Sequence, residues 1–148
     1  MIKNVETLLD YFSRIRKVYA GRLKVKHGEH TLSPNEIDIL ILLSNNKTID
    51  TCGGLNMLLK VSKGLVSRSL TNLAARGLIR MWPDDEDRRI RHIGLTEEAS
   101  PVLEQINRGI REINDFILED VTEEEIDQME RTMEKIMRNF KAAEERYI

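Results

Sequence analysis

The chain of 148 residues is long enough for one compact unit of ordinary size, and 41% of its residues are apolar. Its longest apolar run, residues 37–43, is interrupted by Asp38 and is far shorter than the roughly 20 residues that cross a bilayer, which excludes a transmembrane helix. The N-terminal residues lack the pattern of a signal peptide, and the single cysteine, Cys52, cannot form an intramolecular disulfide. We therefore expect a cytoplasmic protein without a membrane partner.

Charge is distributed unevenly along the chain. The formal net charge is -2, but residues 60–92 carry +4 and residues 96–148 carry -8. The four acidic residues of the basic segment all lie between Asp84 and Asp87. A polyanion would therefore meet the middle of the chain and not its C-terminal part.

Two helices are predicted before residue 46. Residues 2–24 place apolar side chains at spacings of three and four, the stripe of an amphipathic helix. That stripe consists of Val5, Leu8, Leu9, Phe12, Ile15, Tyr19 and Leu23. Ser33 and Glu36 have the spacing of a capping box, and Pro34 stands at the first position of a second helix. This helix is expected to end near Asn46.

Two short helices separated by a tight turn follow. Residues 51–59 are predicted to form the first, although Gly53 and Gly54 each weaken a helix by about 1 kcal/mol relative to alanine. Ser62 can cap the second helix, and Gly77 can end it in the left-handed conformation. The inward-facing residues of the second helix are predicted to be Leu65, Val66, Leu70 and Leu73.

A projecting β-hairpin is predicted next. Residues 78–82 and 90–95 have strand character, and the tip between them, residues 83–89, is too polar for burial. A helix-turn-helix followed directly by such a hairpin is typical of a winged helix. The chain is therefore predicted to be mainly α with a small β-hairpin, a winged helix-turn-helix with long terminal helices.

Two long helices complete the predicted chain. Thr96 is expected to cap the first, with Glu97 and Glu98 in its first turn. A capping box from Thr122 to Glu125 opens the second. The apolar stripes are Val102, Leu103, Ile106, Ile110, Ile113 and Ile117 on the first helix, and Ile126, Met129, Met133, Ile136 and Phe140 on the second. The second stripe has the spacing of a heptad-like seam.

The helix-turn-helix and the hairpin indicate recognition of duplex DNA. An α-helix fits the major groove of B-DNA, whereas a narrow ribbon reaches the backbone or the minor groove. Ser62 and the first-turn N–H groups suit a phosphate, Arg68 can make a bidentate contact to guanine, and Asn72 can approach a base or a phosphate. The predicted DNA-binding residues are Ser62, Lys63, Gly64, Ser67, Arg68, Thr71 and Asn72 on the fourth helix, with Arg88 and Arg89 in the hairpin tip.

Four segments, taken together and in order, resemble the MarR family of transcription regulators. They are residues 61–68 (VSKGLVSR), 76–80 (RGLIR), 84–89 (DDEDRR) and 95–99 (LTEEA). Each segment is weak evidence alone, but their order and spacing are specific, and the element order agrees over nearly the whole length. The chain departs from the family pattern where Lys60 replaces a frequent turn glycine.

The resemblance implies one MarR-like unit over residues 1–148. Residues 33–95 would form the winged-helix DNA-binding region, and residues 1–31 and 96–148 would supply the dimerisation helices. The fourth helix would enter the major groove and Arg89 the minor groove, with Asp87 holding the arginine in position.

The resemblance also implies a regulator without a cofactor whose partners are double-stranded DNA, a second copy of the chain and a small effector. We expect a repressor homodimer on a pseudo-palindromic operator, with the two reading helices about 34 Å apart. An aromatic or anionic effector would bind between the dimerisation helices and the reading module and release the DNA. The candidate effector-lining residues are Tyr11, Phe12, Arg16 and Tyr19.

Three other interpretations compete with DNA binding. A winged-helix module could dock on protein through its acidic C-terminal helices, and its affinity for duplex DNA would then not fall steeply with salt. An enzyme is disfavoured because the sequence has no phosphate-cradling glycine loop, no metal-ligand cluster and no nucleophile motif with a base in recognisable spacing. The basic residues could also form an ordinary solvated surface, with Arg80 and Arg91 paired to the acids of the hairpin tip.

Ordinary structure also accounts for the cysteine, the histidines and the methionines. Cys52 near a helix start could be a redox sensor, because a helix N-terminus lowers a thiol pKa, but a small residue at a helix start is the preferred interpretation. The three histidines have no ligand spacing with Cys52, so no metal site is predicted. Met129, Met133 and Met137 are expected to fill a core or a dimer seam.

Overall fold

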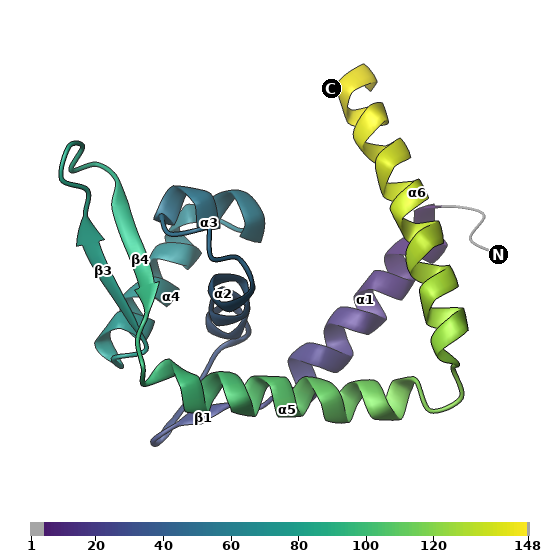
Figure 1. Cartoon of the computed structure of the whole chain (residues 1–148), viewed down its shortest axis with the longest axis horizontal. Helices are drawn as coiled ribbons and strands as arrows, with labels where there is room; N and C mark the ends of the chain where they lie inside the picture. Colours follow the sequence, from purple (N-terminus) through teal and green to yellow (C-terminus); the bar gives the residue numbers. More distant parts are fainter. Residues whose placement is uncertain (1–4, 148) are drawn as a thin grey trace. The chain divides into compact units, whose positions relative to one another are not determined.

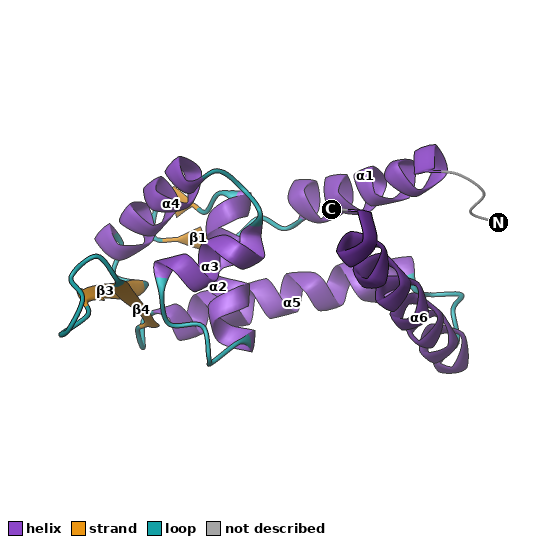
Figure 2. Cartoon of the chain, turned by 90° about the horizontal axis from the view of Figure 1, so that it is seen from above, coloured by secondary structure: helices purple, strands orange, loops and turns teal. Residues whose placement is uncertain are grey.

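The computed structural model describes residues 5–147, without the side chains of Val5 and Leu8, and the chain forms two compact units divided between Arg111 and Glu112. Helix predominates, and the strands form two short hairpins (Figures 1 and 2). The elements are α1 (Val5–Arg22), β1 (Lys26–His27), β2 (His30–Thr31), α2 (Pro34–Asn45), α3 (Cys52–Leu59), α4 (Lys63–Ala75), β3 (Ile79–Pro83), β4 (Arg91–Leu95), α5 (Ala99–Ile117) and α6 (Glu123–Tyr147).

The first four predicted helices are confirmed as α1 to α4. Residues 2–4 of the first predicted helix, and the Val5 and Leu8 side chains of its stripe, lie outside the described part of the chain. Hydroxyl oxygens cap the N-termini of α2, α3 and α4, where Ser33, Thr51 and Ser62 each accept a hydrogen bond from the backbone N–H three residues later. These caps satisfy donors that a helix N-terminus leaves free.

Apolar side chains from α2, α3, α4, β3, β4 and α5 form one core in the first unit. Its fully buried members include Ile39 and Leu40 of α2, Leu55 of α3, Leu73 of α4 and Ile106 of α5. Burying a side chain of this size stabilises the fold by about 1.5–3 kcal/mol relative to leaving it in water. The helix-turn-helix and the hairpin therefore share a single core.

The predicted inward face of α4 is confirmed in part. Val66, Leu70 and Leu73 are buried, whereas Leu65 is only half-buried. Ser69 is buried on the same face, and its hydroxyl gave no apolar signal in the sequence.

A buried ion pair joins α2 to the end of α4, and it corrects the predicted capping box. Ser33 accepts from the Glu36 N–H at 3.2 Å, but the Glu36 carboxylate does not return to Ser33. Instead, Glu36 Oε2 accepts from Arg76 Nη1 at 2.8 Å, with 5% of the Glu36 side chain and 20% of the Arg76 side chain exposed. A carboxylate so deeply buried requires a charged partner, and Arg76 supplies it.

The turn between α4 and β3 also binds the segment that precedes α5. Gly77 has φ 74°, and Thr96 donates its hydroxyl hydrogen to the Gly77 carbonyl oxygen at 2.6 Å. The prediction that Thr96 caps α5 is therefore wrong, because its hydroxyl is bound elsewhere and α5 begins at Ala99. Glu97 and Glu98 accordingly lie before the helix and not in its first turn.

The β3–β4 hairpin, here called the wing, confirms the prediction with strand bounds shifted by one residue. Ile79 pairs with Leu95 and Pro83 with Arg91 in an antiparallel register. The wing packs against α4 through β3 and against α2 and α3 through β4, and Figure 1 shows it extending beside these helices. Ile93 is buried between strand and helices and fixes which face points inward.

A second, two-stranded hairpin was not predicted. Lys26 pairs with Thr31 and His27 with His30 around a turn in which Gly28 has φ 61°. Gln105 of α5 binds this hairpin, because its amide nitrogen donates to the Lys26 carbonyl at 3.0 Å and its amide oxygen accepts from the Lys26 N–H at 3.3 Å. Each of these strands has only two residues, too few to produce an alternating sequence pattern.

The second unit contains the end of α5 and the whole of α6. The predicted capping box is complete here: Thr122 Oγ1 accepts from the Glu125 N–H, and Glu125 Oε2 accepts from the Thr122 N–H. No residue of α6 is buried. In the single chain its methionines therefore fill no core, and the dimer-seam alternative stays a prediction.

No helix within residues 5–147 is long and apolar enough to span a membrane.

Arg76→Met tests the buried ion pair. Removing one partner of such a pair leaves a buried charge, usually at a cost of about 3–5 kcal/mol, and the partial exposure of Arg76 reduces our expectation to about 2 kcal/mol of unfolding free energy. Urea unfolding at fixed protein concentration measures the loss. Adding Glu36→Gln to this variant should recover part of it.

The matched control is Arg14→Met. Arg14 binds Asp10 at the same distance of 2.8 Å, but 77% of the Arg14 side chain and 55% of the Asp10 side chain are exposed. This variant should change the free energy of unfolding by less than about 0.5 kcal/mol. Equal losses in the two arginine variants would contradict a structural role for the buried pair.

Lys60→Gly should stabilise the protein. Lys60 ends α3 with φ 51°, in the left-handed region that costs a non-glycine residue about 1–2 kcal/mol. Part of that gain is offset by the greater freedom of glycine in the unfolded chain, so we expect about 0.5–1 kcal/mol. Lys63→Gly, three residues later in α4, should have the opposite sign, and a destabilised Lys60→Gly variant would refute the argument.

Candidate nucleic-acid interface

The predicted DNA-facing residues of α4 lie together on its solvent face. All of them are exposed, opposite the buried apolar stripe: Ser62, Lys63, Gly64, Ser67, Arg68, Thr71 and Asn72. The Ser62 hydroxyl already accepts from the Leu65 N–H at 3.3 Å, and the Thr71 hydroxyl donates to the Ser67 carbonyl at 2.9 Å. The cations Lys63 and Arg68 have no such local partner among the described residues.

At the wing tip, Asp87 holds the Arg89 side chain in one orientation. Asp87 Oδ1 accepts from Arg89 Nε and from the Arg89 backbone N–H, and Oδ2 accepts from Nη2, all at 3.1 Å. These hydrogen bonds from Arg89 lower the pKa of Asp87 below its usual range. Nevertheless, 91% of the Arg89 side chain is exposed. The guanidinium is therefore fixed at one edge and open at the other, and Arg88 beside it is also exposed.

Asp84 shapes the same tip from its other end. Its Oδ2 accepts from the backbone N–H groups of Glu86 and Asp87 at 3.1 and 3.0 Å, and its Oδ1 lies 2.7 Å from His92 Nε2. The hydrogen bond with His92, followed by the two backbone bonds, lowers the pKa of Asp84. The suggestion that Arg80 and Arg91 pair with the wing acids is wrong: within the described residues neither arginine forms such an ion pair, and Asp84 binds His92 while Asp87 binds Arg89.

Arg80 instead lies over an aromatic ring on the wing. Its guanidinium carbon is 4.9 Å from the Trp82 ring centroid, and Trp82 stacks on His92 with centroids 5.6 Å apart. Gly94 leaves room for this arrangement, since a Cβ there would lie 3.3 Å from two Trp82 ring atoms.

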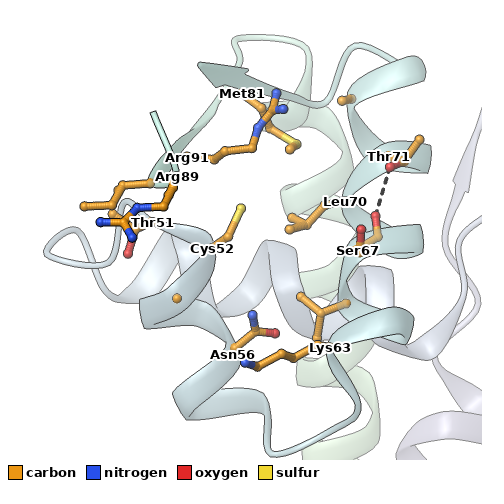
Figure 3. A pocket seen from close by; sticks show the side chains of 14 residues that line it. Thr51, Cys52, Asn56, Lys63, Ser67, Leu70, Thr71, Met81, Arg89 and Arg91 are labelled. Atoms are coloured by element: carbon orange, nitrogen blue, oxygen red, sulfur yellow. Dashed lines mark hydrogen bonds between the residues drawn. The ribbon is translucent and has the colours of Figure 1, made fainter. Parts of the chain in front are cut away.

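A crevice of about 790 Å³ lies between α3, α4 and the wing. Figure 3 shows side chains from all three elements around it, including Asn56 of α3, Thr71 of α4 and Arg91 of the wing. Lys63, Ser67, Thr71 and Arg89 of the predicted DNA-binding set also line it. The crevice thus brings the polar face of α4 and the wing arginine to one place.

The candidate effector residues all lie on α1 and away from the crevice. Tyr11, Phe12 and Arg16 are exposed and Tyr19 is half-buried, and none of the four lines the crevice. Arg16 acts on Asp38 of α2: burial raises the pKa of Asp38, and the positive charge of Arg16 opposes that rise. Among the described residues, no three His, Cys, Asp or Glu side chains gather as metal ligands.

The model of the MarR family matches residues 30–90. The crystal structure of MarR is similar with a TM-score of 0.74 at 20% identity, covering 99% of this chain and 97% of that one. A MarR transcriptional regulator from Methanosarcina mazei Go1 gives 0.74 at 17% identity, with 94% and 97% covered. FabT from Streptococcus pneumoniae, solved in complex with DNA, gives 0.68 at 23% identity, with 93% and 95% covered.

Residues 30–90 thus match the MarR family model, and the whole chain has the fold of the solved MarR-type regulators. The resemblance drawn from the four sequence segments is therefore confirmed, as is the winged-helix fold with long terminal helices. The MarR family, whose model residues 30–90 match, consists of transcription regulators and not of enzymes, as the sequence reasoning expected.

Sequence reasoning missed several residues that line the crevice or shape the wing tip. Asn56 and Arg91 line the crevice, and Asp84 and His92 organise the wing tip. The signal for Asp84 was present, because an aspartate followed by polar residues favours a turn in which its side chain accepts from later N–H groups. His92 gave no local signal.

Cys52 lines the crevice at the start of α3. Burial raises the pKa of its thiol, and the positive charge of Arg91 only partly opposes that rise. The helix N-terminus therefore does not make Cys52 a thiolate at neutral pH. This favours the interpretation of Cys52 as a small residue near a helix start.

Cys52 should consequently react slowly with iodoacetamide. Because its pKa is raised, the reactive thiolate is scarcer than in a free thiol, and its reaction should accelerate only at higher pH. We expect alkylation at about pH 8 to be at least about threefold slower in the folded chain than in urea, as followed by mass spectrometry. Arg91→Gln should slow it further, whereas faster alkylation of the folded chain would refute the raised pKa.

Proposed function

We propose that the chain is a sequence-specific transcription repressor that binds duplex DNA as a homodimer through α4 and the wing. The observation that carries this proposal is the crevice lined both by Lys63, Ser67 and Thr71 of α4 and by Arg89 of the wing. Two consecutive elements, α4 and the wing, present cations and hydroxyls to one surface, as a groove and its flanking phosphates require. FabT, which is similar in fold, was solved in complex with DNA, and this supports DNA binding by the chain.

Within this interface, α4 supplies the major-groove contacts. Arg68 carries an exposed guanidinium whose fork matches the two acceptors of guanine, and Asn72 lies one turn further along the same face. Lys63 and the N-terminal turn of α4 suit a phosphate. Phosphate contacts fix the position of the helix, and base contacts provide specificity.

Arg89 enters the minor groove in this proposal, with Arg88 near the adjacent phosphates. Asp87 accepts hydrogen bonds from Arg89 Nε and from one hydrogen of Arg89 Nη2. The hydrogens on Arg89 Nη1 therefore remain free to donate. The minor-groove edge of an A·T pair offers only acceptors, so an oriented arginine fits it well. Prior orientation by Asp87 reduces the side-chain entropy lost on binding.

The terminal helices, residues 1–31 and 96–148, form the dimer in this proposal. Support comes from α6, whose Met129, Ile136 and Phe140 side chains are exposed in the isolated chain. Apolar side chains repeated at heptad-like spacing are expected to be covered by a partner helix. A two-fold dimer would place two copies of α4 about 34 Å apart, which matches half-sites one helical turn apart.

An effector would act on this dimer by binding its DNA-free shape more tightly. A small aromatic or anionic molecule suits the α1 residues, because Tyr11 and Phe12 offer exposed rings and Arg16 offers a cation. Such a ligand releases DNA only through its different affinity for the two dimer shapes.

The decisive experiment is selection of random duplexes by the purified protein, followed by binding of the enriched sequence across a salt series. We expect a pseudo-palindrome with half-sites about ten base pairs apart and an affinity that falls steeply with salt. Failure to enrich any sequence in the absence of effector, with no salt-dependent binding, would instead favour a module that docks on protein.

Arg68→Ala and Arg89→Ala test the assigned contacts on that duplex. Each should weaken binding by about tenfold or more, since a base-reading arginine contributes about 1–3 kcal/mol, while sedimentation shows an unchanged dimer. Arg108→Ala, which removes an exposed cation of α5, should leave the affinity within about twofold. Unchanged affinity in both test variants would disprove the site.

A further inference from the structure

His92 lies where the wing meets the segment that precedes α3. Its Nε2 is 2.7 Å from Asp84 Oδ1 of the wing, and its Nδ1 is 3.7 Å from Asp50 Oδ2. The backbone joins the same two segments, because Ile93 N–H donates to the Asp50 carbonyl at 2.7 Å and Thr51 forms a β-bridge with His92. The imidazole is thus a side-chain link between the body of the winged helix and the wing.

A continuous set of contacts leads from His92 to Arg89 at the wing tip. Asp84 uses one carboxylate oxygen for His92 and the other for the backbone N–H groups of Glu86 and Asp87. Asp87 in turn holds the Arg89 guanidinium with both of its carboxylate oxygens. Displacement of Asp84 would therefore alter the turn that carries the Asp87–Arg89 pair.

We propose that protonated His92 is a positioning residue that holds the wing between Asp84 and Asp50, so that DNA binding weakens when His92 loses its proton. This inference rests on the proposed function of the α4 and wing surface. His92 touches no DNA in this scheme and acts through Asp84, Asp87 and Arg89.

The donor inventory of imidazole explains why the proton matters. A neutral imidazole donates from one nitrogen and presents a lone pair at the other, whereas imidazolium donates from both. His92 faces a carboxylate at each nitrogen, so a neutral ring must turn a lone pair toward one of them. Loss of the proton therefore replaces one attraction by a repulsion and loosens the link.

The charged groups around the ring determine the pH range of this effect. The hydrogen bond to Asp84 raises the pKa of His92, the negative charges of Asp84 and Asp50 add to that rise, and burial opposes it. On the strands, Arg80 lies over the Trp82 ring on which His92 stacks, and Arg91 lines the crevice. The link should be complete below about pH 6.5, the ordinary histidine pKa, and lost as the pH rises through the raised value. Asp84, whose pKa is lowered, stays charged throughout.

The test is the affinity of wild-type, His92→Gln and His30→Gln proteins for the selected duplex between about pH 5.5 and about pH 8.5, at constant salt. Wild-type binding should weaken by about threefold as the pH rises, the size expected for one partly exposed charge pair. His92→Gln should bind with the weaker affinity at every pH, because glutamine cannot titrate. His30→Gln, which removes an exposed histidine of β2, should follow wild type.

A second readout needs no DNA. In an NMR titration of the wild-type protein, His92 should titrate above about pH 6.5, and the amides of residues 84–90 should become more mobile over the same range. Asp84→Asn should bring the pKa of His92 down, because it removes the nearest negative charge.

The outcomes separate the two proposals. A His92→Gln profile parallel to that of wild type would overturn the positioning role while leaving the proposed function intact. Absence of duplex binding by wild type at every pH would overturn the proposed function. In that case the titration still decides whether His92 holds the wing, because wing mobility that is independent of pH would overturn that role directly.

Discussion

The turn at residues 76–78 fixes the direction in which the chain leaves α4, and the rest of the interface depends on it. The Arg76 side chain is bound to the buried Glu36, Gly77 adopts a left-handed conformation, and Leu78 is fully buried. An ion pair, a backbone conformation and apolar burial thus constrain three consecutive residues. Because β3 begins at the next residue, the crevice between α4 and the wing owes its geometry to this turn.

The acidic residues of the wing are compatible with a surface that meets DNA. Asp84 binds His92 and two backbone N–H groups, and Asp87 binds Arg89. The charges of Asp84 and Asp87 are therefore used within the tip, where they orient cations and shape the turn. A basic patch can therefore exist in a chain whose formal net charge is -2, because the charges that matter are those left unbalanced at the surface.

Much of the fold could be predicted because its signals are local. Ser33, Thr51 and Ser62 cap their helices through bonds to the residue three positions later, a spacing that sequence shows directly. The polar face of α4 followed from helical periodicity, and the wing from two apolar strands around a polar tip. The Asp87–Arg89 pair came from the resemblance to the MarR family and lies two residues apart in the sequence.

The sequence by itself therefore determined the winged-helix order, the exposed face of α4 and the cations of the wing, since each depends on neighbours within one turn or strand. Only the tertiary structure decided which partner a polar side chain takes when several are chemically suitable. The Glu36 carboxylate binds Arg76, 40 residues away, and not the backbone of its own helix start. The Thr96 hydroxyl binds the Gly77 carbonyl, 19 residues away, and does not cap α5. Because these groups are shielded from water, their hydrogen bonds to the distant partners are stronger than bonds to local groups would be. The spacing of residues in the sequence does not show which groups folding brings together.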